Sequence, residues 1–531
     1  MNEHEPVIAV QILLGAPLES LASTEMSGRL AQSAASRLAG LADDLGIPGH
    51  VTVHVDGDHT APHPIGITVH GKPAEYARSL DQQVLVACRH QADPGNRAST
   101  LPTWDDQLAA GPDACMAAIT EVAGHAIAAR AFVMLGEEQV AAWRQQSAEP
   151  LRGDLGEVLG ELLGLRLSVR DVARISAILA GCADATAPDA AEQVIEEIRP
   201  RTLEIRVEPA YLAEIAKASA DSGHTKFPYL RDRLYLDLGL RLPSLRLVPD
   251  ARLGPRCYVV RVNHLDTAPI VGPPPGMCLI NAPAVQISQI VSAAVDALNP
   301  ATDVPGAFVP VDKRADLEAL GYTAWDPLDH LVLALAEVAR AQAGALIDHG
   351  AVTSELDRFR QVQPILTSSI QESLPLSRFT RLLRSLLDER VPVRDLRQLA
   401  QELSDRAVSG LPESDDQLHA LARLAYAGQI SSQLTVRGSI VVYLLDPSLE
   451  EGVMATDQAT ASDASDALVA AFDAEIRTLP HNATRPLLLT TQSARLPVRR
   501  AIATAWPRVP VLCYQELDPA VNVLPLARLA P

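Results

Sequence analysis

One pattern of apolar residues occurs twice in this sequence, 224 positions apart. In the first occurrence Asp154 precedes apolar residues spaced as on one face of a helix, and Val169-Arg170-Asp171 follows them. In the second, segment 377–392 carries a similar stripe and Val393-Arg394-Asp395 follows. The corresponding stripe positions are Leu155 and Phe379, Val158 and Leu382, Leu159 and Leu383, Leu162 and Leu386, and Leu163 and Leu387. Because all these positions correspond at one offset, we predict two copies of one helical hairpin.

Weaker matches precede each hairpin in the same order. Asp44-Leu45-Gly46 resembles Asp237-Leu238-Gly239, and each precedes a segment with strand character. Apolar residues alternate in 7–12 as they do in 203–207. The sequence therefore predicts tandem modules at residues 1–185 and 200–410, each with strands and helices first and a helical hairpin last. Ala183–Ala191, which is rich in Ala, Asp and Pro, is the predicted linker.

The last part of the chain, 413–531, has a different pattern. Short apolar runs at 440–445, 487–490 and 511–514 alternate with helical patterns at 468–477 and 494–505, which predicts a small βαβ-type domain. Gly452–Asp466 is predicted to be a mobile loop because its residues are mostly small and polar. The expected fold class is α/β and α+β multidomain: small α/β subdomains, helical hairpins in two tandem modules, and the C-terminal domain.

Charge and composition exclude several classes of function. The formal net charge is −20 and only 4% of the residues are aromatic, which argues against nucleic acid as a partner. The hairpin at 377–403 has the length of a helix-turn-helix, but acidic residues crowd its second helix. Arg394 and Asp395 are therefore predicted to be a turn and capping pair.

Neither a membrane span nor an export signal is expected. No apolar run reaches the roughly 18–20 uncharged residues that a spanning helix needs. The six cysteines are scattered without the spacing of a disulfide framework or a zinc site. These features predict a soluble cytoplasmic protein.

The richest cluster of side chains with metal-binding potential includes His50, His54, His59 and His63. His50 and His54 share one face of a predicted strand, and an Asp-Gly-Asp turn follows. A transition-metal site is one interpretation, and a solvated strand edge is the other. Neither a phosphate-binding loop nor a hydrolase or zinc-protease motif occurs elsewhere. We therefore expect neither an enzyme nor a cofactor.

The second half resembles the FHIPEP family, the export-gate proteins of flagellar and type III secretion systems, in four ordered segments. Ala319-Leu320-Gly321-Tyr322-Thr323 with Asp326-Pro327 is similar to the family's ALGYTVVDP segment. The stretch from Val391 to Leu396, which contains Val393, Arg394 and Asp395, resembles VPIRDL. Residues 445–450 and 511–517 resemble its LDPxLE and VLSYNEI strands. The resemblance covers residues 200–531, the cytoplasmic part of the family, with a divergent copy at 1–185.

Two departures from the family pattern bear on function. The family's RDNxxLPxxxYxI stretch is replaced by residues 248–258, which keep only Asp250, Leu253 and Tyr258 at comparable places. By family position Asp250 and Tyr258 are candidates for a partner cleft; the alternative is that Tyr258 fills the sheet core and Asp250 caps a turn. The second departure is that we expect no counterpart of the family's amino-terminal membrane domain, since no apolar run here is long enough to span a membrane.

The resemblance implies a non-enzymatic scaffold that binds protein partners such as secretion substrates, chaperones or components of the apparatus. It also implies self-association, because the family's cytoplasmic part forms a ring, and at most peripheral membrane association through a partner. Two further hypotheses are a repurposed cytoplasmic adaptor in an assembly or signalling system other than secretion, and a metal-dependent enzyme that uses the His50–His63 loop.

Overall fold

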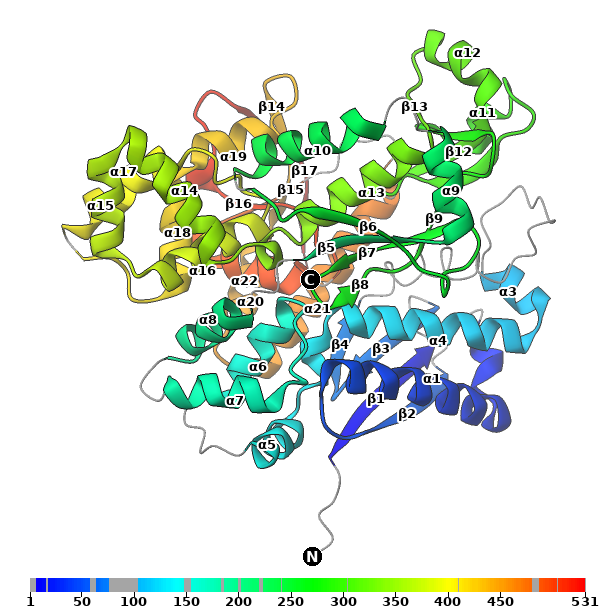
Figure 1. Cartoon of the computed structure of the whole chain (residues 1–531), viewed down its shortest axis with the longest axis horizontal. Helices are drawn as coiled ribbons and strands as arrows, with labels where there is room; N and C mark the ends of the chain where they lie inside the picture. Colours follow the sequence, from blue (N-terminus) through cyan, green and yellow to red (C-terminus); the bar gives the residue numbers. More distant parts are fainter. Residues whose placement is uncertain are drawn as a thin grey trace, which may run out of the picture. The chain divides into compact units, whose positions relative to one another are not determined.

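The computed structural model describes most of the chain in segments that fall into two compact units. The described residues are 6–15, 18–57, 64–75, 104–147, 154–182, 186–198, 202–218, 223–239, 241–302, 304–408, 410–479, 487–503 and 505–530. The first unit comprises residues 1–236 and 241–348, and the second comprises 237–240 and 349–531 (Figure 1). This division by compactness differs from the predicted division into modules by sequence similarity, which stays a prediction. No helix among the described residues is long and apolar enough to cross a membrane.

The first sheet of the first unit has the order β2-β1-β3-β4. Its strands are β1 (Val7–Leu14), β2 (His50–Gly57), β3 (Ile65–Val69) and β4 (Lys72–Glu75). β1 runs parallel to β2 and antiparallel to β3. The 3-10 turn η1 (Leu18–Ala22) and helix α1 (Thr24–Leu45) connect β1 to β2, and α1 contacts β2. Alternate residues of β1 are buried, as the apolar alternation predicts.

Helices complete this part of the first unit. They are α3 (Trp104–Ala110), α4 (Pro112–Ala129), η3 (Ala131–Met134), α5 (Glu137–Gln146), α6 (Leu155–Gly164), α7 (Val172–Gly181) and α8 (Ala187–Ile198). α4 lies beside α1 (Figure 1). The side chains of Asp154 and Asp171 cap α6 and α7. The prediction of a linker at Ala183–Ala191 is wrong from Ala187 onward, because the apolar face of α8 packs on α6.

The second sheet repeats the strand order and directions of the first. Its order is β6-β5-β7-β8, with β9 paired to β7; β5 runs parallel to β6 and antiparallel to β7. The strands are β5 (Leu203–Val207), β6 (Leu245–Pro249), β7 (Cys257–Val262), β8 (Leu265–Asp266) and β9 (Ile270–Val271). Helices α9 (Pro209–Ala218) and α10 (Gly223–Leu238) connect β5 to β6.

A third, antiparallel sheet follows, with the order β11-β12-β10-β13. Its elements are β10 (Met277–Ile280), α11 (Ala284–Ile287), β11 (Val295–Leu298), β12 (Pro305–Pro310), η4 (Val311–Lys313), α12 (Arg314–Ala319) and β13 (Ala324–Trp325). Cys278, Ile280, Val309 and Leu317 lie in its own small core. Helix α13 (Pro327–Ala341) and η5 (Gly344–Leu346) complete the first unit.

Helices form the first half of the second unit. They are α14 (His349–Val362), α15 (Pro364–Ser373), α16 (Leu376–Asp388), α17 (Leu396–Ala407), α18 (Asp415–Ala425) and α19 (Ala427–Leu434). All five stripe positions of α16 are buried, as are the five corresponding positions of α6. The predicted apolar faces of both hairpins are thus confirmed.

The C-terminal domain is a parallel sheet with the order β16-β15-β14-β17. Its elements are β14 (Ser439–Leu445), α20 (Pro447–Val453), α21 (Gln458–Thr478), β15 (Leu487–Thr490), α22 (Gln492–Ala503), β16 (Val511–Cys513), η6 (Tyr514–Glu516) and β17 (Asn522–Leu529). The predicted alternation of strands and helices is confirmed. The prediction of a loop at Gly452–Asp466 is wrong except at 454–457, because α20 extends to Val453 and α21 begins at Gln458 with a side-chain cap from Asp457.

Candidate functional site

The candidate metal ligands lie at the edge of the first sheet. His50 and His54 are both on β2, an edge strand, and their side chains are exposed. No group of three or more His, Cys, Asp or Glu side chains placed to hold a metal ion occurs in the described parts of the chain. His59 and His63 lie outside the described residues. The metal site therefore stays a prediction.

Asp250 lies in the turn that follows β6 and is held by arginines. Its carboxylate accepts hydrogen bonds from the backbone nitrogen of Arg252 at 3.0 Å and from the Arg252 guanidinium at 2.9 and 2.7 Å. Arg206 approaches the same carboxylate at 3.5 Å. The hydrogen bonds from the Arg252 guanidinium hold the pKa of the Asp250 carboxyl well below its usual value. This is the geometry of a capped turn.

Tyr258 lies on β7 and its side chain is fully buried. Its hydroxyl is hydrogen-bonded to Nδ1 of His330 on α13 at 2.8 Å, and the two rings meet edge to face. Burial raises the pKa of the Tyr258 hydroxyl well above its usual value. Both residues thus have the core and turn geometry that the sequence left open as the alternative. A partner-binding role for Asp250 and Tyr258 stays a prediction.

The segment Val393-Arg394-Asp395 joins α16 to α17. The buried Val393 donates its backbone hydrogen bond to the Leu238 carbonyl at 2.9 Å. The Asp395 carboxylate accepts from the backbone nitrogen of Arg397, which caps α17 as predicted. The role of this segment in the described structure is to fix the hairpin.

The segment that contains Gly321, Tyr322 and Asp326 runs from the end of α12 through β13 to the start of α13. Gly321 adopts a φ of +90°, and the Tyr322 hydroxyl accepts a hydrogen bond from Gln286 at 3.0 Å. Asp326 caps α13. Lys226 of α10 lies 2.7 Å from the Asp326 carboxylate and 2.7 Å from that of Asp329.

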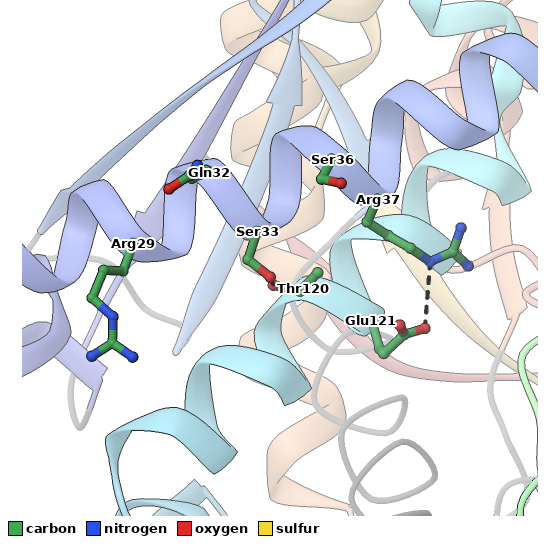
Figure 2. Close-up of a pocket in the computed structure, with 7 residues that line it drawn as sticks. All are labelled: Arg29, Gln32, Ser33, Ser36, Arg37, Thr120 and Glu121. Carbon is green, nitrogen blue, oxygen red and sulfur yellow. Dashed lines mark hydrogen bonds and ion pairs between the residues drawn. The ribbon is translucent and has the colours of Figure 1, made fainter.

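A polar groove lies along α1 and α4 in the first unit (Figure 2). Its volume is about 570 Å³. Its lining residues are Arg29, Gln32, Ser33, Ser36, Arg37, Thr120 and Glu121. Arg29 is paired with Asp113 at 2.5 Å, and Arg37 lies 3.6 Å from the Glu121 carboxylate, as Figure 2 shows for the second pair. Because both arginines already face a carboxylate, nothing in this groove calls for a charged ligand.

A second hollow, the α16–α22 cleft, lies within the second unit between helices α16, α18 and α22. Its volume is about 440 Å³, within the usual range of ligand sites. Its apolar lining residues include Leu382, Leu418 and Leu496. Its charged lining residues are Arg378, Arg381, Asp388, Glu389, Asp415, Asp416, Arg499 and Arg500. The cleft thus combines apolar contacts with many charges.

Glu389 and His419 of the cleft lining belong to a buried network of charges. Arg495 donates to the Glu389 carboxylate at 2.5 and 3.1 Å. Arg423 donates to Glu389 at 3.1 Å and to Glu516 at 2.5 Å. The side chains of Arg423, Arg495 and Glu516 are at most 4% exposed. These contacts connect the end of α16 with α18, α22 and η6. Removal of one member would leave a buried charge without its partner and would destabilise the second unit.

Burial and neighbouring charges shift two pKa values in this network. Burial alone would raise the pKa of Glu389, but the charges of Arg423 and Arg495 outweigh it and lower the pKa to about 2. Burial lowers the pKa of His419 to about 4, although Glu389 opposes the shift. At neutral pH Glu389 is therefore ionised and His419 is neutral.

Sequence reasoning missed this network. Glu389 occupies the position of Leu165 in the first hairpin, by the offset that relates the two stripes. His419 and Arg423 lie among the apolar residues of α18, and both are buried. Charged residues on the apolar face of α18 could have indicated a buried charge network. Their partners at the end of α16, in α22 and in η6 could not be identified, because they are far away in the sequence.

Comparison with known proteins finds a family match for more than half of the chain. A family model described as the FHIPEP family matches residues 181–522. The flagellar biosynthesis protein FlhA of Bacillus subtilis is 23% identical over 309 residues, which cover 55% of this chain and 44% of that protein. The hypersensitivity response secretion protein HrcV of Ralstonia nicotianae is 27% identical over 332 residues, which cover 60% of this chain and 47% of that protein. The chain thus spans less than half the length of these curated relatives.

Solved structures share the fold. The CdsV protein of Chlamydia pneumoniae matches with a TM-score of 0.56 and 24% identity, over 62% of this chain and 98% of that chain. The structure of the complex of CdsV with the CdsO protein matches with a TM-score of 0.56 and 25% identity, over 62% and 97% of the two chains.

Proposed function

Because this chain belongs to the FHIPEP family, we propose that it is a non-enzymatic protein-binding scaffold linked to protein secretion. In this role it docks secretion substrates or their chaperones. The observation that carries the proposal is the family match, which covers more than half of the chain. The complex of a structural relative with the CdsO protein supports binding of protein partners. We also propose that the chain acts in the cytoplasm.

Exposed apolar side chains support the proposal of a protein-binding role. In the small domain of the third sheet, Val285 is 77% exposed and Leu320 is 62% exposed. In the second unit, Ile365 of α15 is 83% exposed. Contact with a partner protein would remove these side chains from water, which favours binding.

We propose further that residues 1–185 are a divergent copy of residues 200–410. The equal strand order and directions of the first two sheets support this proposal. Arg166 and Arg390 correspond by the hairpin offset, and both have positive φ, of 62° and 59°. The family model matches from residue 181 onward, so residues 1–180 of the first copy lie outside the match.

A second candidate function follows from that unmatched copy. A duplicated and diverged module favours a repurposed adaptor that works in an assembly other than secretion. The neighbouring genes discriminate between the two functions. Genes for export-apparatus components favour secretion, and their absence favours the adaptor.

Affinity purification from the native host tests the leading proposal. The tagged full chain is purified after mild crosslinking, and the bound proteins are identified by mass spectrometry. We expect export-apparatus components, secretion substrates or their chaperones among them. Recovery of none of these in repeated purifications would remove the link to secretion.

Self-association stays a prediction that the purified chain can test. A ring requires a mass several times that of the 56.7 kDa chain. Light scattering at micromolar concentration that shows only the monomer would exclude a stable ring of this chain alone.

A further inference from the structure

Arg499 of α22 lines the α16–α22 cleft, and its partners among the described residues are backbone carbonyls. Its guanidinium donates to the carbonyl oxygens of Pro507 at 2.8 Å, Trp506 at 3.4 Å and Val509 at 3.5 Å. Within the described parts of the chain, no carboxylate lies within ion-pair distance of it. A guanidinium that is mostly withdrawn from water without an anionic partner is costly.

The other arginines that line this cleft differ from Arg499. Arg378 and Arg381 lie 2.7 and 3.1 Å from the Asp415 carboxylate. Arg500 lies 2.7 Å from Asp416. Behind them, Glu389 is already shared between two arginines. The cleft therefore offers one guanidinium whose charge the described residues do not neutralise.

Burial lowers the pKa of the Arg499 guanidinium. Glu389 opposes this shift, and the charges of Arg495 and Arg423 add to it. The direction of the shift means that the surroundings of Arg499 disfavour its positive charge. An anion bound in the cleft would relieve this.

His419 is a neighbour of Arg499 in the lining of the same cleft and belongs to the Glu389 network. Its residue is 5% exposed, and its Nδ1 lies 3.4 Å from Nη2 of Arg495. Its Nε2 is buried and has no hydrogen-bond partner among the residues that the structure describes; the Glu389 carboxylate is 3.6 Å away. Because Arg495 donates to Nδ1, the neutral imidazole carries its proton on Nε2, on the side of the Glu389 carboxylate.

We propose that the α16–α22 cleft binds a carboxylate of an acidic, leucine-containing segment of a partner protein, with Arg499 as its anchor. The partly exposed Leu496 supplies an apolar contact for a side chain beside that carboxylate, and the buried Leu382 and Leu418 lie in the floor of the cleft. The inference rests on the proposed protein-binding function and names the chemistry of the partner.

A carboxylate fits this cleft better than a phosphate. Asp388, Glu389, Asp415 and Asp416 line the same cleft as Arg499. One further negative charge neutralises the one available guanidinium, whereas the dianion of a phosphate would add repulsion from these carboxylates.

Peptide binding to the full chain tests the proposal. The probe is a fluorescein-labelled ten-residue peptide of leucine and glutamate, and its partner probe has glutamine in place of every glutamate. Fluorescence anisotropy measures both dissociation constants. We expect the glutamate peptide to bind at least about tenfold more tightly. Equal binding of the two peptides would overturn the proposal, and this comparison needs no variant protein.

Two variants then locate the site. Arg499→Gln removes the charge and keeps an amide that can donate to the carbonyls of the loop after α22. We expect it to weaken binding of the glutamate peptide at least about tenfold. The control is Arg406→Gln, which removes an exposed arginine of α17 that pairs with Glu402. We expect the control to bind as the wild type does. Equal effects of the two substitutions would place binding elsewhere.

Inorganic phosphate separates the two kinds of anion. We expect millimolar phosphate at constant ionic strength to leave peptide binding unchanged. Displacement of the peptide by phosphate in the wild type but not in Arg499→Gln would assign the cleft to phosphate and overturn the carboxylate. The binding and purification experiments fail independently, since peptide binding without secretion partners removes only the proposed function.

Discussion

Gly46 lies so close to Arg170 that a β-carbon on the glycine would overlap the Arg170 Cα and amide nitrogen. Gly239 stands in the same relation to Arg394 in the second unit. The adjacent hydrogen bonds also correspond: Val169 donates to the Leu45 carbonyl at 2.8 Å, as Val393 does to Leu238. In both places a helix ends where the hairpin connection passes, and only glycine leaves room for it.

Substitution of either glycine by alanine should destabilise the protein. Gly46 and Gly239 have φ of +77° and +87°, and the new methyl group would also collide with backbone. Strain and collision together predict a loss of about 3 kcal/mol for Gly46→Ala and for Gly239→Ala. Urea denaturation followed by circular dichroism measures it.

The matched control is Gly40→Ala in α1, where no atom lies within 4 Å of the added methyl group. Alanine in a helix interior should add roughly 0.5–1 kcal/mol of stability. If Gly46→Ala were as stable as Gly40→Ala, the close approach of Gly46 to Arg170 would be wrong.

Tyr258→Phe should reduce stability although it keeps the ring. The change removes the hydroxyl that is bonded to His330 in a fully buried site, which predicts a cost of about 1–3 kcal/mol. Tyr229→Phe is the control, since Tyr229 of α10 is 71% exposed and its change should be nearly neutral. Thermal unfolding compares them. If the Tyr258→Phe protein had the melting temperature of the wild type but no longer bound a purified partner, the binding role of Tyr258 would be favoured instead.

The apolar faces of both hairpins were predictable because they depend on local spacing. Leu155 and Leu163 lie on the apolar face of α6, where apolar residues recur every three or four positions. Phe379 and Leu387 lie on the corresponding face of α16. Asp154 as a helix cap was predictable for the same reason. Such features need only residues that are near one another in the chain.

Other features depend on partners that the sequence does not place together. α21 is rich in Ala, Ser, Asp and Thr and has only a weak apolar stripe, so its composition resembles a loop. β17 is an edge strand in which Leu524 and Leu526 are exposed. The pattern of apolar residues along β17 therefore does not indicate which face is buried. The Glu389 network joins residues up to 106 positions apart.

Asn263 should matter for how residues 165–168 pack on the second sheet. The buried Asn263 side chain donates to the carbonyls of Leu165 and Ala345, each at 2.9 Å, and it has φ of +54°. Glycine can adopt the same positive φ, so Asn263→Gly removes only the side-chain hydrogen bonds. We expect a loss of about 2 kcal/mol in the free energy of unfolding.

Hydrogen exchange at the Ser168 amide reports this change locally, because that amide donates to His264 at 2.9 Å. Exchange should be faster in Asn263→Gly than in the wild type. The control Asn522→Ala alters an exposed residue of β17 and should leave it unchanged. Unchanged protection of Ser168 in Asn263→Gly would show that the asparagine does not hold this contact.

Acidic pH should destabilise the second unit through His419. The residue faces Arg423 from its own helix, Glu389 from the end of α16, Arg495 from α22 and Glu516 from η6. Its folded pKa is lowered to about 4 from 6.5, so the unfolded chain takes up the proton first as pH falls. The stability contributed by neutral His419 is present above pH 6.5 and is lost as the pH falls toward 4.

From pH 7 to pH 5 this group alone predicts a loss of about 2 kcal/mol in the free energy of unfolding. Glu389 adds to the loss below pH 4.5, because its folded pKa is lowered to about 2. Calorimetric unfolding across this range should show a shallower pH dependence for His419→Gln than for the wild type. His50→Gln, which changes an exposed histidine outside the network, is the control. Parallel pH profiles for wild type and His419→Gln would mean that burial of His419 does not hold it neutral.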